Sequence, residues 1–245
     1  MGTSYGADTV TNGLILSLDA GDKNSYGGSG STWYDLCGNN DTTINGATYN
    51  SGGYFVLDGT NDYFQVTDDG SSDFAKQTFS IELWCYVVAN NLGLNYTTFW
   101  SYDYTSWDSP YHAQHFRTYN RNNTPYYTLY AASNRDGNWS SSPSWPRHWG
   151  PSYIPNKWTH LVWTLGDGGT TKISTLYQDG SSLETETFTS WSDITYYNQE
   201  VWIGKGNLSS FYYEGNIATV KFYDRALSSQ EVTQNFNAHK NRFGV

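Results

Sequence analysis

Paired carboxylates are the first residues in this chain whose type and spacing suit a reaction. Glu184 and Glu186 are two residues apart, and a strand places such residues on one face of a sheet. Two carboxyl groups that flank a glycosidic bond, one of them protonated, can hydrolyse it. The alternative is that both belong to a solvated edge strand after a tight turn at Asp179-Gly180, and the sequence favours that interpretation.

The other titratable residues give no catalytic pattern. Glu82 stands alone in "SIELW", where it alternates with Ile81 and Leu83, which predicts a polar strand position. His160, inside "WTHLVW", is predicted to be a strand residue with a satisfied ring nitrogen. No Ser/His/Asp order stands out among the five histidines, His112, His115, His148, His160 and His239. We therefore expect that the protein is not an enzyme.

Aromatic residues gather between residues 91 and 157, among prolines and polar residues. Trp and Tyr present a flat apolar face with a polar tip, which suits a sugar ring or a protein partner. The stretch "NRDGNWSSSPSWPRHWG" is too polar around its tryptophans to be a buried strand, and Arg135, Asp136 and His148 could orient a ligand there. The predicted carbohydrate-binding residues are Trp139, Trp145, Trp149, Trp107, Tyr111 and Arg147. The alternative is a local core or subunit interface, above all for Phe99, Trp100, Tyr102, Trp107 and Tyr111.

Composition limits the classes of protein that remain. Aromatic residues make up 18% of the 245 residues, and 24 glycines supply turns, which favours strands over a helical bundle. The formal charge of −10 argues against a nucleic-acid partner. The sequence "MGTSYGADTVTNG" resembles no export signal, and no run of about 18 apolar residues predicts membrane insertion. Cys37 and Cys85 are expected to be free thiols, with a single bridge as the alternative.

Short alternating runs bounded by Gly, Asn or Asp predict the elements that would position these residues. They fill residues 13–90 and return after residue 157, whereas long loops are expected at about 91–157, with strand-like runs only near Thr97–Tyr102 and Tyr126–Ala131. Ser228 followed by Glu231 is a capping-box pattern that predicts one short helix near the C-terminus. The pattern predicts one all-β domain over residues 1–245, a two-sheet antiparallel sandwich with a loop insertion at about 91–157.

The order of these runs resembles the laminin-G-like branch of the concanavalin A-like lectin/glucanase superfamily. The resemblance is carried by "GLILSLDA", "WYDLCGNN", "YFVLDGTNDYFQV", "FSIELWCYV", "KWTHLVWTL", "TLYQDG", "VWIGKG" and "GNIATVKFYDRALSSQEVTQNF". It implies a jelly-roll sandwich whose last strand is covered by the short C-terminal helix, with Val232 and Phe236 facing inward. The resemblance implies a comparison with the glucanases of the superfamily, whose catalytic strand carries a pattern similar to Glu-x-Asp-x-Glu. Glu184-Thr185-Glu186 lacks the central Asp and the third acid of that pattern.

The resemblance also implies one structural calcium ion. Calcium takes about six to eight oxygen ligands, and the turns "YDLCGNND" and "LDGTNDY" are rich in oxygen. The predicted metal ligands are Asp35, Asn39, Asp58 and Asp62, with Asp41 and Asn61 beside them. The alternative is that these residues only stabilise turns, because Asn and Asp bond to their own backbone. Relatives often carry Ile-Asp-Glu where this chain has Ile217-Ala218-Thr219, so a ligand from that strand would be missing.

Two segments, "GLILSLDAGDKNSYGGSGSTWYDLCGNND" and "NFNAHKNRFGV", are most similar to laminin-G-like proteins of tailed, marine bacteriophages. This similarity implies a non-catalytic virion protein, in an appendage or decorating the capsid. Its expected partners are host-surface carbohydrate or other virion proteins, with homo-oligomers as a further expectation. The alternatives are a secreted, extracellular carbohydrate-binding lectin module or a glycoside hydrolase.

Overall fold

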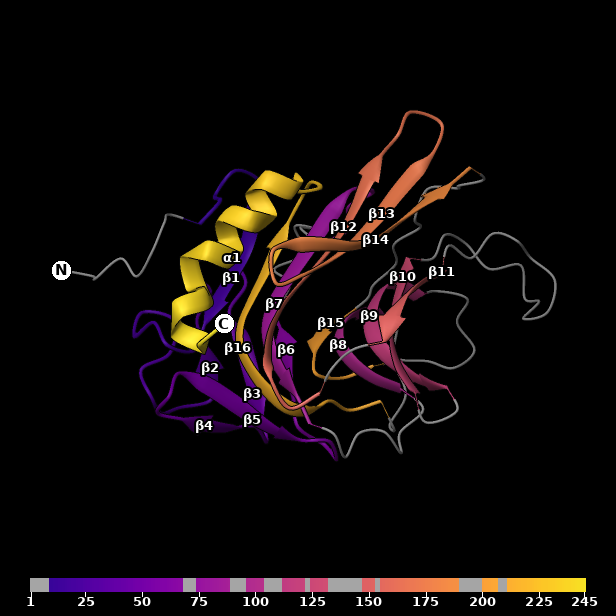
Figure 1. The fold of residues 1–245 in the computed structure, drawn as a ribbon. Coiled ribbons are helices and arrows are strands. Elements are labelled where there is room, and N and C mark those ends of the chain that lie inside the picture. The colour runs from indigo at the N-terminus through magenta and orange to yellow at the C-terminus, as the bar shows by residue number, and fades with distance from the viewer. Residues whose placement is uncertain are drawn as a thin grey trace.

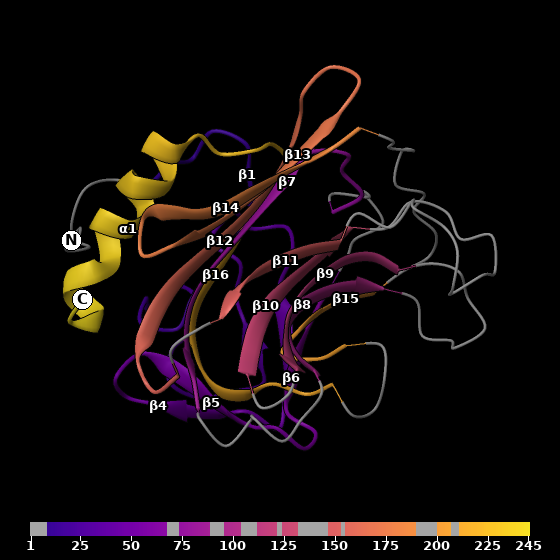
Figure 2. The same cartoon turned by 45° about the vertical axis from the view of Figure 1, so that its right-hand side comes forward.

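Two antiparallel β-sheets, which we call sheet A and sheet B, face each other. One helix lies on the outer side of sheet A, away from sheet B (Figure 1; Figure 2). In this computed structural model the described residues are 9–67, 74–88, 96–103, 112–121, 124–131, 147–152, 155–189, 200–206 and 211–245. The predicted fold class, an all-β concanavalin A-like sandwich with a short C-terminal helix, is confirmed.

Sheet A contains eight strands, seven of them in one hydrogen-bonded path. The path runs β14 (Ser181–Phe188), β13 (Lys172–Gln178), β12 (Trp158–Asp167), β7 (Phe79–Val87), β16 (Glu214–Tyr223), β5 (Tyr54–Asp58) and β4 (Thr48–Asn50), and β1 (Leu14–Asp19) pairs with β16. The long strands β7, β12 and β16 occupy the middle of the sheet, so their side chains decide what each face of sheet A presents.

Sheet B also contains eight strands. They follow the order β11 (Arg147–Ser152), β10 (Thr124–Ala131), β9 (His112–Arg121), β8 (Tyr96–Asp103), β15 (Glu200–Ile203), β6 (Tyr63–Val66), β3 (Thr42–Asn45) and β2 (Thr32–Trp33). The two strand-like runs predicted within residues 91–157 coincide with β8 and β10. The expectation of long loops in the rest of that segment is wrong for β9 and β11, and the four strands together form half of sheet B. Mixed polar and aromatic runs such as "HAQHFRTYNR" concealed a strand that only pairing with its neighbours reveals.

The core between the sheets is built from large aromatic side chains. Phe222 of β16 stacks on Phe79 with 5.9 Å between ring centroids, and on Trp100 of sheet B at 5.4 Å. Phe99 and Tyr102 are also buried. These three residues of β8 are therefore core, which confirms the local-core interpretation for Phe99, Trp100 and Tyr102. Burying such rings removes a large apolar area from water, the main stabilising contribution to a sandwich.

The tight turn predicted at Asp179-Gly180 joins β13 to β14. Both residues have positive φ, 50° and 79°, as a two-residue hairpin turn requires. β14 is the edge strand of sheet A, where Glu184 is exposed and Glu186 is partly exposed. Burial and the neighbouring Glu184 raise the pKa of Glu186. The solvated-edge interpretation of this carboxylate pair is confirmed.

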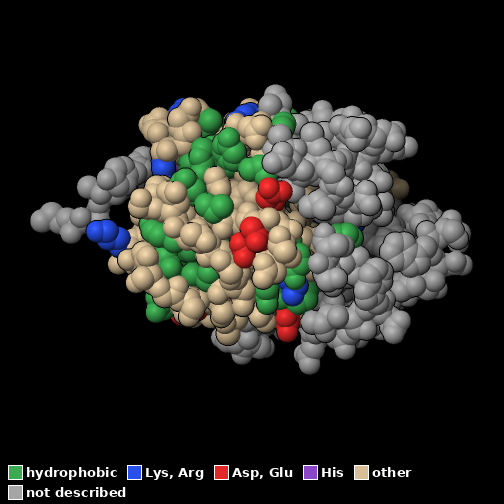
Figure 3. Space-filling model, turned by 90° about the horizontal axis from the view of Figure 1, so that it is seen from below, with side chains coloured by type: hydrophobic (Ala, Val, Ile, Leu, Met, Phe, Trp, Pro, Cys, Tyr) green, Lys and Arg blue, Asp and Glu red, His purple; other side chains and the backbone are tan. Residues whose placement is uncertain are grey.

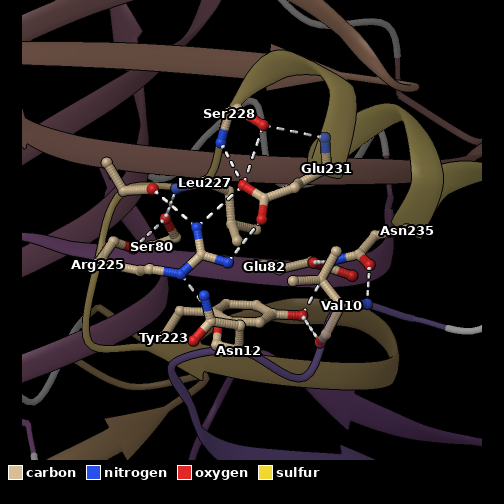
Figure 4. Close-up of polar contacts among 11 residues, drawn as sticks. Val10, Asn12, Ser80, Glu82, Tyr223, Arg225, Leu227, Ser228, Glu231 and Asn235 are labelled. Atoms are coloured by element: carbon tan, nitrogen blue, oxygen red, sulfur yellow. Dashed lines mark hydrogen bonds and ion pairs between the residues drawn. The ribbon is translucent and has the colours of Figure 1, made fainter.

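Helix α1 (Ser229–Phe243) begins with the predicted capping box. The Ser228 hydroxyl accepts a hydrogen bond from the Glu231 amide at 3.3 Å, and the Glu231 carboxylate accepts one from the Ser228 amide at 2.8 Å. Arg225 holds the same carboxylate, with 2.6 Å between Nη2 and Oε1 (Figure 4). The described part of the chain contains no helix with the length and apolar character needed to cross a bilayer.

Replacement of the capping residue tests this helix start. Ser228→Ala should lower the free energy of unfolding by about 1 kcal/mol, because it removes the acceptor of an otherwise unpaired amide. Ser229→Ala, one residue further on, is the matched control and should leave stability nearly unchanged. Equal melting temperatures for the wild type and Ser228→Ala would show that the serine does not cap the helix.

A buried polar network, which we call the Glu82 network, joins α1 to sheet A. The fully buried Glu82 carboxylate lies 2.8 Å from Lys221 Nζ and 3.3 Å from His160 Nε2. Its second oxygen accepts a hydrogen bond from Asn235 Nδ2 of the helix at 2.6 Å. Although burial alone raises the pKa of Glu82, Lys221 and His160 outweigh it and hold that pKa well below its usual range. The predicted polar strand position is therefore a charged anchor for the helix.

The Glu82 network also ties down the N-terminal segment. Asn235 Nδ2 donates to the Tyr223 hydroxyl at 2.9 Å, and that hydroxyl donates to the Val10 carbonyl at 3.2 Å (Figure 4). The Val10 amide in turn donates to Asn235 Oδ1 at 2.8 Å. One asparagine of the helix thus satisfies groups from two strands and from the beginning of the chain. Residues more than 200 positions apart are held together as a result.

The helix covers the face of sheet A across several strands. Val232 is buried and Phe236 stacks on Trp84 of β7 at 5.8 Å, so both point inward as predicted. β16 itself has neighbours on both sides, β7 and β5, and is not an exposed edge. The expectation that the helix covers the last strand is therefore too narrow. The sequence shows which helix residues face inward, but it does not show that the helix lies across β7 and β12.

Removal of one charge from the network should be costly. Lys221→Met leaves the buried Glu82 carboxylate without its cation, and we expect a loss of about 3 to 5 kcal/mol in the free energy of unfolding. The double variant Lys221→Met/Glu82→Gln should recover part of that loss, because no charge then stays buried while Asn235 keeps an acceptor. Denaturant unfolding measures both. Equal losses in the two variants would contradict an ionic role.

Candidate functional site

The outer face of sheet B, the face turned away from the core, gathers polar and aromatic side chains. In β15, Val201 and Ile203 belong to the core, so Trp202 between them points to the outside. The same alternation in β6 places Tyr63 and Gln65 on the outer face. Trp202 is paired in register with Gln65 on one side. An aromatic ring and an amide thus lie next to each other on the same face.

Pairing across the sheet extends this row toward the predicted site. Successive register partners are Gln65, Trp202, Ser101, His115, Tyr130 and Arg147. A second row pairs Thr98, Arg117, Thr128 and Trp149. Arg147 and Trp149, predicted as carbohydrate-binding residues from the sequence, therefore occupy β11 at the far end of rows that begin near Trp202. Trp107, Tyr111, Trp139 and Trp145, with Arg135 and Asp136, lie outside the described residues.

Lys205 is the central charged group at the β15 end of this face. Its Nζ lies 4.4 Å from the ring centroid of Tyr63 and 4.4 Å from that of Trp202, a distance typical of a cation–π contact. Burial lowers the pKa of Lys205, and Glu200 partly opposes that effect. Nζ donates to no acceptor within the described part of the chain. Its hydrogen-bond donors are thus not used by that part of the chain.

The backbone after β15 positions Lys205. Gly204 has a φ of 81°, a conformation that glycine adopts without strain, and its amide donates to the Phe99 carbonyl of β8 at 3.0 Å. Ser101 Oγ then donates to the Lys205 carbonyl at 2.6 Å. The chain is thus fixed to sheet B on both sides of the turn. The lysine consequently has little freedom to leave the two rings.

Other partly exposed rings lie beside this pair. Tyr212 has its ring centroid 6.4 Å from that of Tyr63, and Arg117 Cζ lies 6.0 Å from the ring centroid of Phe211. Trp202 itself is only 2% exposed, so Tyr63, Tyr212 and Lys205 form the accessible part. We call Tyr63, Trp202, Lys205 and Tyr212 the sheet B cluster. Its chemistry, flat rings around an ammonium group, suits binding.

Sequence reasoning missed the sheet B cluster. The run "EVWIGKG" was predicted as a strand, but its three successive apolar residues Val201, Trp202 and Ile203 show no alternation that separates inside from outside. The signal that could have found it is Lys205, a cation two residues after a strand that contains tryptophan. The sequence could not show that Tyr63 lies beside them, because β6 and β15 become neighbours only in the folded sheet.

The residues predicted to bind calcium are used by the backbone. One oxygen of Asp35 accepts hydrogen bonds from the amides of Ser17 and Cys37, and the other from those of Asn39 and Asn40. These four amides occupy the directions from which a cation would bind the carboxylate. Asn39 therefore contributes an amide donor, and Asp35 as arranged does not fit a calcium ion.

Asp58 and Asp62 form a similar turn. Asp62 Oδ2 accepts from the Asp58 amide at 3.0 Å, and Asp58 Oδ1 accepts from the Thr60 amide at 2.8 Å. Burial raises the pKa of Asp62, the hydrogen bond from the Asp58 amide opposes that effect, and the charge of Asp58 adds to it. Among the described residues no group of three or more His, Cys, Asp or Glu side chains is placed to hold a metal ion. The geometry supports the turn alternative, and calcium binding itself stays a prediction for experiment.

A chelator decides between the two roles. A ligand that binds only the folded state stabilises it by mass action, so loss of a structural calcium ion would lower the melting temperature. Because the Asp35 oxygens are already occupied by amides, we expect EDTA to leave the melting temperature unchanged in thermal unfolding. A decrease that added calcium reverses, with magnesium as the control cation, would contradict the turn role.

Both thiols are free, as predicted: Cys37 is partly buried and Cys85 is fully buried in β7. Burial raises the pKa of each thiol, and for Cys37, whose pKa is raised to about 12, the nearby Asp35 adds to the effect. Both shifts favour the neutral thiol over the reactive thiolate.

Comparisons with known proteins agree with this architecture. The profile of a family described as "Concanavalin A-like lectin/glucanases superfamily" matches residues 58–233. A search of curated protein sequences finds no match. Among solved structures, a Trypanosoma rangeli sialidase in complex with 2,3-difluorosialic acid is similar with a TM-score of 0.64 and 16% identity, over 96% of this chain and 34% of the sialidase. The chain thus spans about a third of the sialidase's length.

Two further structures share the fold over most of this chain. Domain 4 of AbnA, an extracellular arabinanase of Geobacillus stearothermophilus, in complex with arabinotriose, gives a TM-score of 0.61 at 19% identity and covers 91% of this chain and 98% of that domain. The receptor-binding domain of a botulinum neurotoxin C/D mosaic serotype gives 0.65 at 14% identity, over 91% of this chain and 51% of that one. At these identities the likeness is one of fold.

Proposed function

Because the chain belongs to the concanavalin A-like lectin/glucanase superfamily, we propose that it is a non-catalytic protein that binds carbohydrate through the outer face of sheet B. The observation that carries this proposal is the Lys205 ammonium between the rings of Tyr63 and Trp202. The partly exposed rings of Tyr63 and Tyr212 provide apolar surface for the C–H faces of a sugar, and the ammonium provides hydrogen-bond donors for its oxygens. Both are needed in one place to orient a saccharide.

The neighbouring rows connect the sheet B cluster to β11 through the backbone register. The row runs from Trp202 through Ser101 and His115, whose side chains are buried, to Arg147, so the accessible contacts of this proposal are those of the sheet B cluster itself. Among the structures with this fold, one is an arabinanase domain in complex with arabinotriose and one is a toxin's receptor-binding domain. These are properties of those proteins, and they make recognition a reasonable role for the fold.

The positions of the carboxylates support a binding role over hydrolysis. Glu82 is fully buried under α1, with both oxygens engaged by other side chains. Glu184 and Glu186 lie on the edge strand of the opposite sheet, away from the sheet B cluster. A glycosidase needs two carboxyl groups on either side of one bond, at a separation set by its mechanism. Glu82, Glu184 and Glu186 are instead divided between a closed anchor and a solvated edge.

We further propose that the protein is part of a virion, as an appendage or capsid-decoration protein of a bacteriophage. This part of the proposal rests on the resemblance of the segment from Gly13 to Asp41 and of the last residues to phage proteins. The partners would be a host-surface glycan, neighbouring virion subunits or further copies of the chain. The alternative is a secreted lectin module. Mass spectrometry of purified virions decides between them, because a virion protein is present in a fixed ratio to the capsid protein.

Glycan binding by the sheet B cluster can be tested directly. Tyr63→Ala/Lys205→Ala should weaken binding on a glycan array by about tenfold or more, because it removes both a ring and a charged donor. Tyr34→Ala, at an exposed tyrosine directly after β2, is the matched control and should bind as the wild type does. Unchanged binding by a cluster variant that keeps its melting temperature would show that recognition lies elsewhere.

A further inference from the structure

A second group of aromatic side chains lies on the outer face of sheet A, beside the end of helix α1. Tyr54 of β5, Tyr86 of β7, Trp158 of β12 and Phe243 at the helix end are all partly exposed. We call these four residues the sheet A aromatic surface. In the view from below, hydrophobic side chains gather in several patches beside acidic ones on the described part of the molecule (Figure 3). Rings that stay accessible to water need an explanation beyond core packing.

Trp158 is the centre of the sheet A aromatic surface. The ring centroids of Tyr54 and Tyr86 lie 5.3 and 5.9 Å from it, and both tyrosine planes are inclined by 69° to the indole. Phe243 lies 4.8 Å away at 43°. The tyrosines therefore stand edge-on to the indole instead of lying flat against it. This edge-to-face arrangement leaves part of each tyrosine ring exposed beside the indole.

Part of this group has a structural role. Phe243 stacks on Trp84 at 4.3 Å with 19° between the planes, and together with its contact to Trp158 this docks the end of the helix. Tyr54 and Tyr86 take no part in that stack, because their ring contacts run to Trp158. Helix docking thus accounts for Phe243 and for one side of the indole. It does not account for the two tyrosines.

The polar tips of these rings point to the chemistry of a ligand. In the part of the chain that the structure describes, the hydroxyls of Tyr54 and Tyr86 and the indole Nε1 of Trp158 make no hydrogen bond to protein. An apolar protein partner would bury these groups at a cost unless it brought matching polar atoms. A saccharide brings both apolar C–H faces and hydroxyl groups, so it can satisfy the rings and their tips together.

Two ion pairs lie around the surface, and the Arg242 guanidinium lies over the Phe243 ring, with 5.0 Å between Cζ and the ring centroid. Lys157 pairs with Asp179 at 3.2 Å, and Arg242 donates to Asp19 at 2.7 Å and to the Gly53 carbonyl at 2.6 Å. A charged ligand would therefore find no unpaired partner among these four side chains. Asn216, partly exposed and paired in register with Tyr86, adds an uncharged polar group. The surroundings favour a neutral ligand.

We infer that the sheet A aromatic surface is a second carbohydrate-binding site, specific for uncharged saccharides. It goes beyond the proposed function because it uses other residues on the opposite side of the sandwich. With both sites present, one molecule can contact two glycan chains, or two parts of one chain, and bind more tightly to a surface than either site alone. The two sites also differ in chemistry, since the sheet B cluster carries an ammonium group that the sheet A surface lacks.

The test uses the whole chain and a panel of immobilised neutral polysaccharides, namely glucans, mannans and galactans, with sulfated and uronic-acid polymers for comparison. Tyr54→Ala/Tyr86→Ala should weaken binding to neutral polysaccharides about tenfold or more, because two contact rings are lost. Tyr54→Phe/Tyr86→Phe keeps the rings and removes the hydroxyls, and should weaken it by a smaller factor of about three to ten, the worth of one or two hydrogen bonds. Thermal unfolding checks that each variant is folded.

The outcomes separate this inference from the proposed function. Loss in the sheet A variants while Lys205→Ala keeps binding to neutral polysaccharides supports an independent second site. Wild-type protein that binds none of the neutral panel, or alanine variants that bind it unchanged, overturns the inference. So does a result in which the phenylalanine variants match the wild type while the alanine variants lose self-association in sedimentation, because the surface would then contact a second copy of the chain. Loss in Lys205→Ala alone affects only the sheet B site.

Discussion

The buried ion pair between Glu82 and Lys221 is the constraint on which the arrangement of the molecule depends. A carboxylate without water costs several kcal/mol unless it is paired and hydrogen-bonded, so each of its partners must stay in place. Those partners come from β16, from β12 and, through Asn235, from helix α1. The same asparagine binds the backbone of Val10. The two ends of the chain and the middle of sheet A are thereby held as one unit.

This anchor determines how the faces of the sandwich are used. With α1 fixed across β7 and β12, much of the outer face of sheet A is closed, and the region past the helix end presents a group of partly exposed rings. The outer face of sheet B has no such anchor among the described residues, and its polar and aromatic side chains form rows across the strands. The two proposed binding surfaces therefore lie on what the helix leaves uncovered and on the opposite sheet.

Aromatic residues serve both the core and the surfaces in this protein. Trp100, Trp163 and Phe222 fill the space between the sheets, whereas Tyr54 and Tyr63 lie on the outside with their rings partly exposed. The difference follows from position in the pleat, because successive residues of a strand point to opposite faces. A composition with 18% aromatic residues thus supplies both the core and the proposed binding surfaces from the same residue types. It also explains why function could not be deduced from the count alone.

The sequence by itself determined what depends on neighbours along the chain. Ser228 and Glu231 define the helix start, Asp179-Gly180 defines a hairpin, and the alternating runs define an all-β sandwich, because these signals arise within a few residues. Tertiary structure alone decided that β8 to β11 join one sheet, that the lone Glu82 is a buried anchor, and that Tyr63 meets Lys205. Such features require strands far apart in sequence to become neighbours. Pairing and burial between distant segments carry no local pattern, and only the folded chain reveals them.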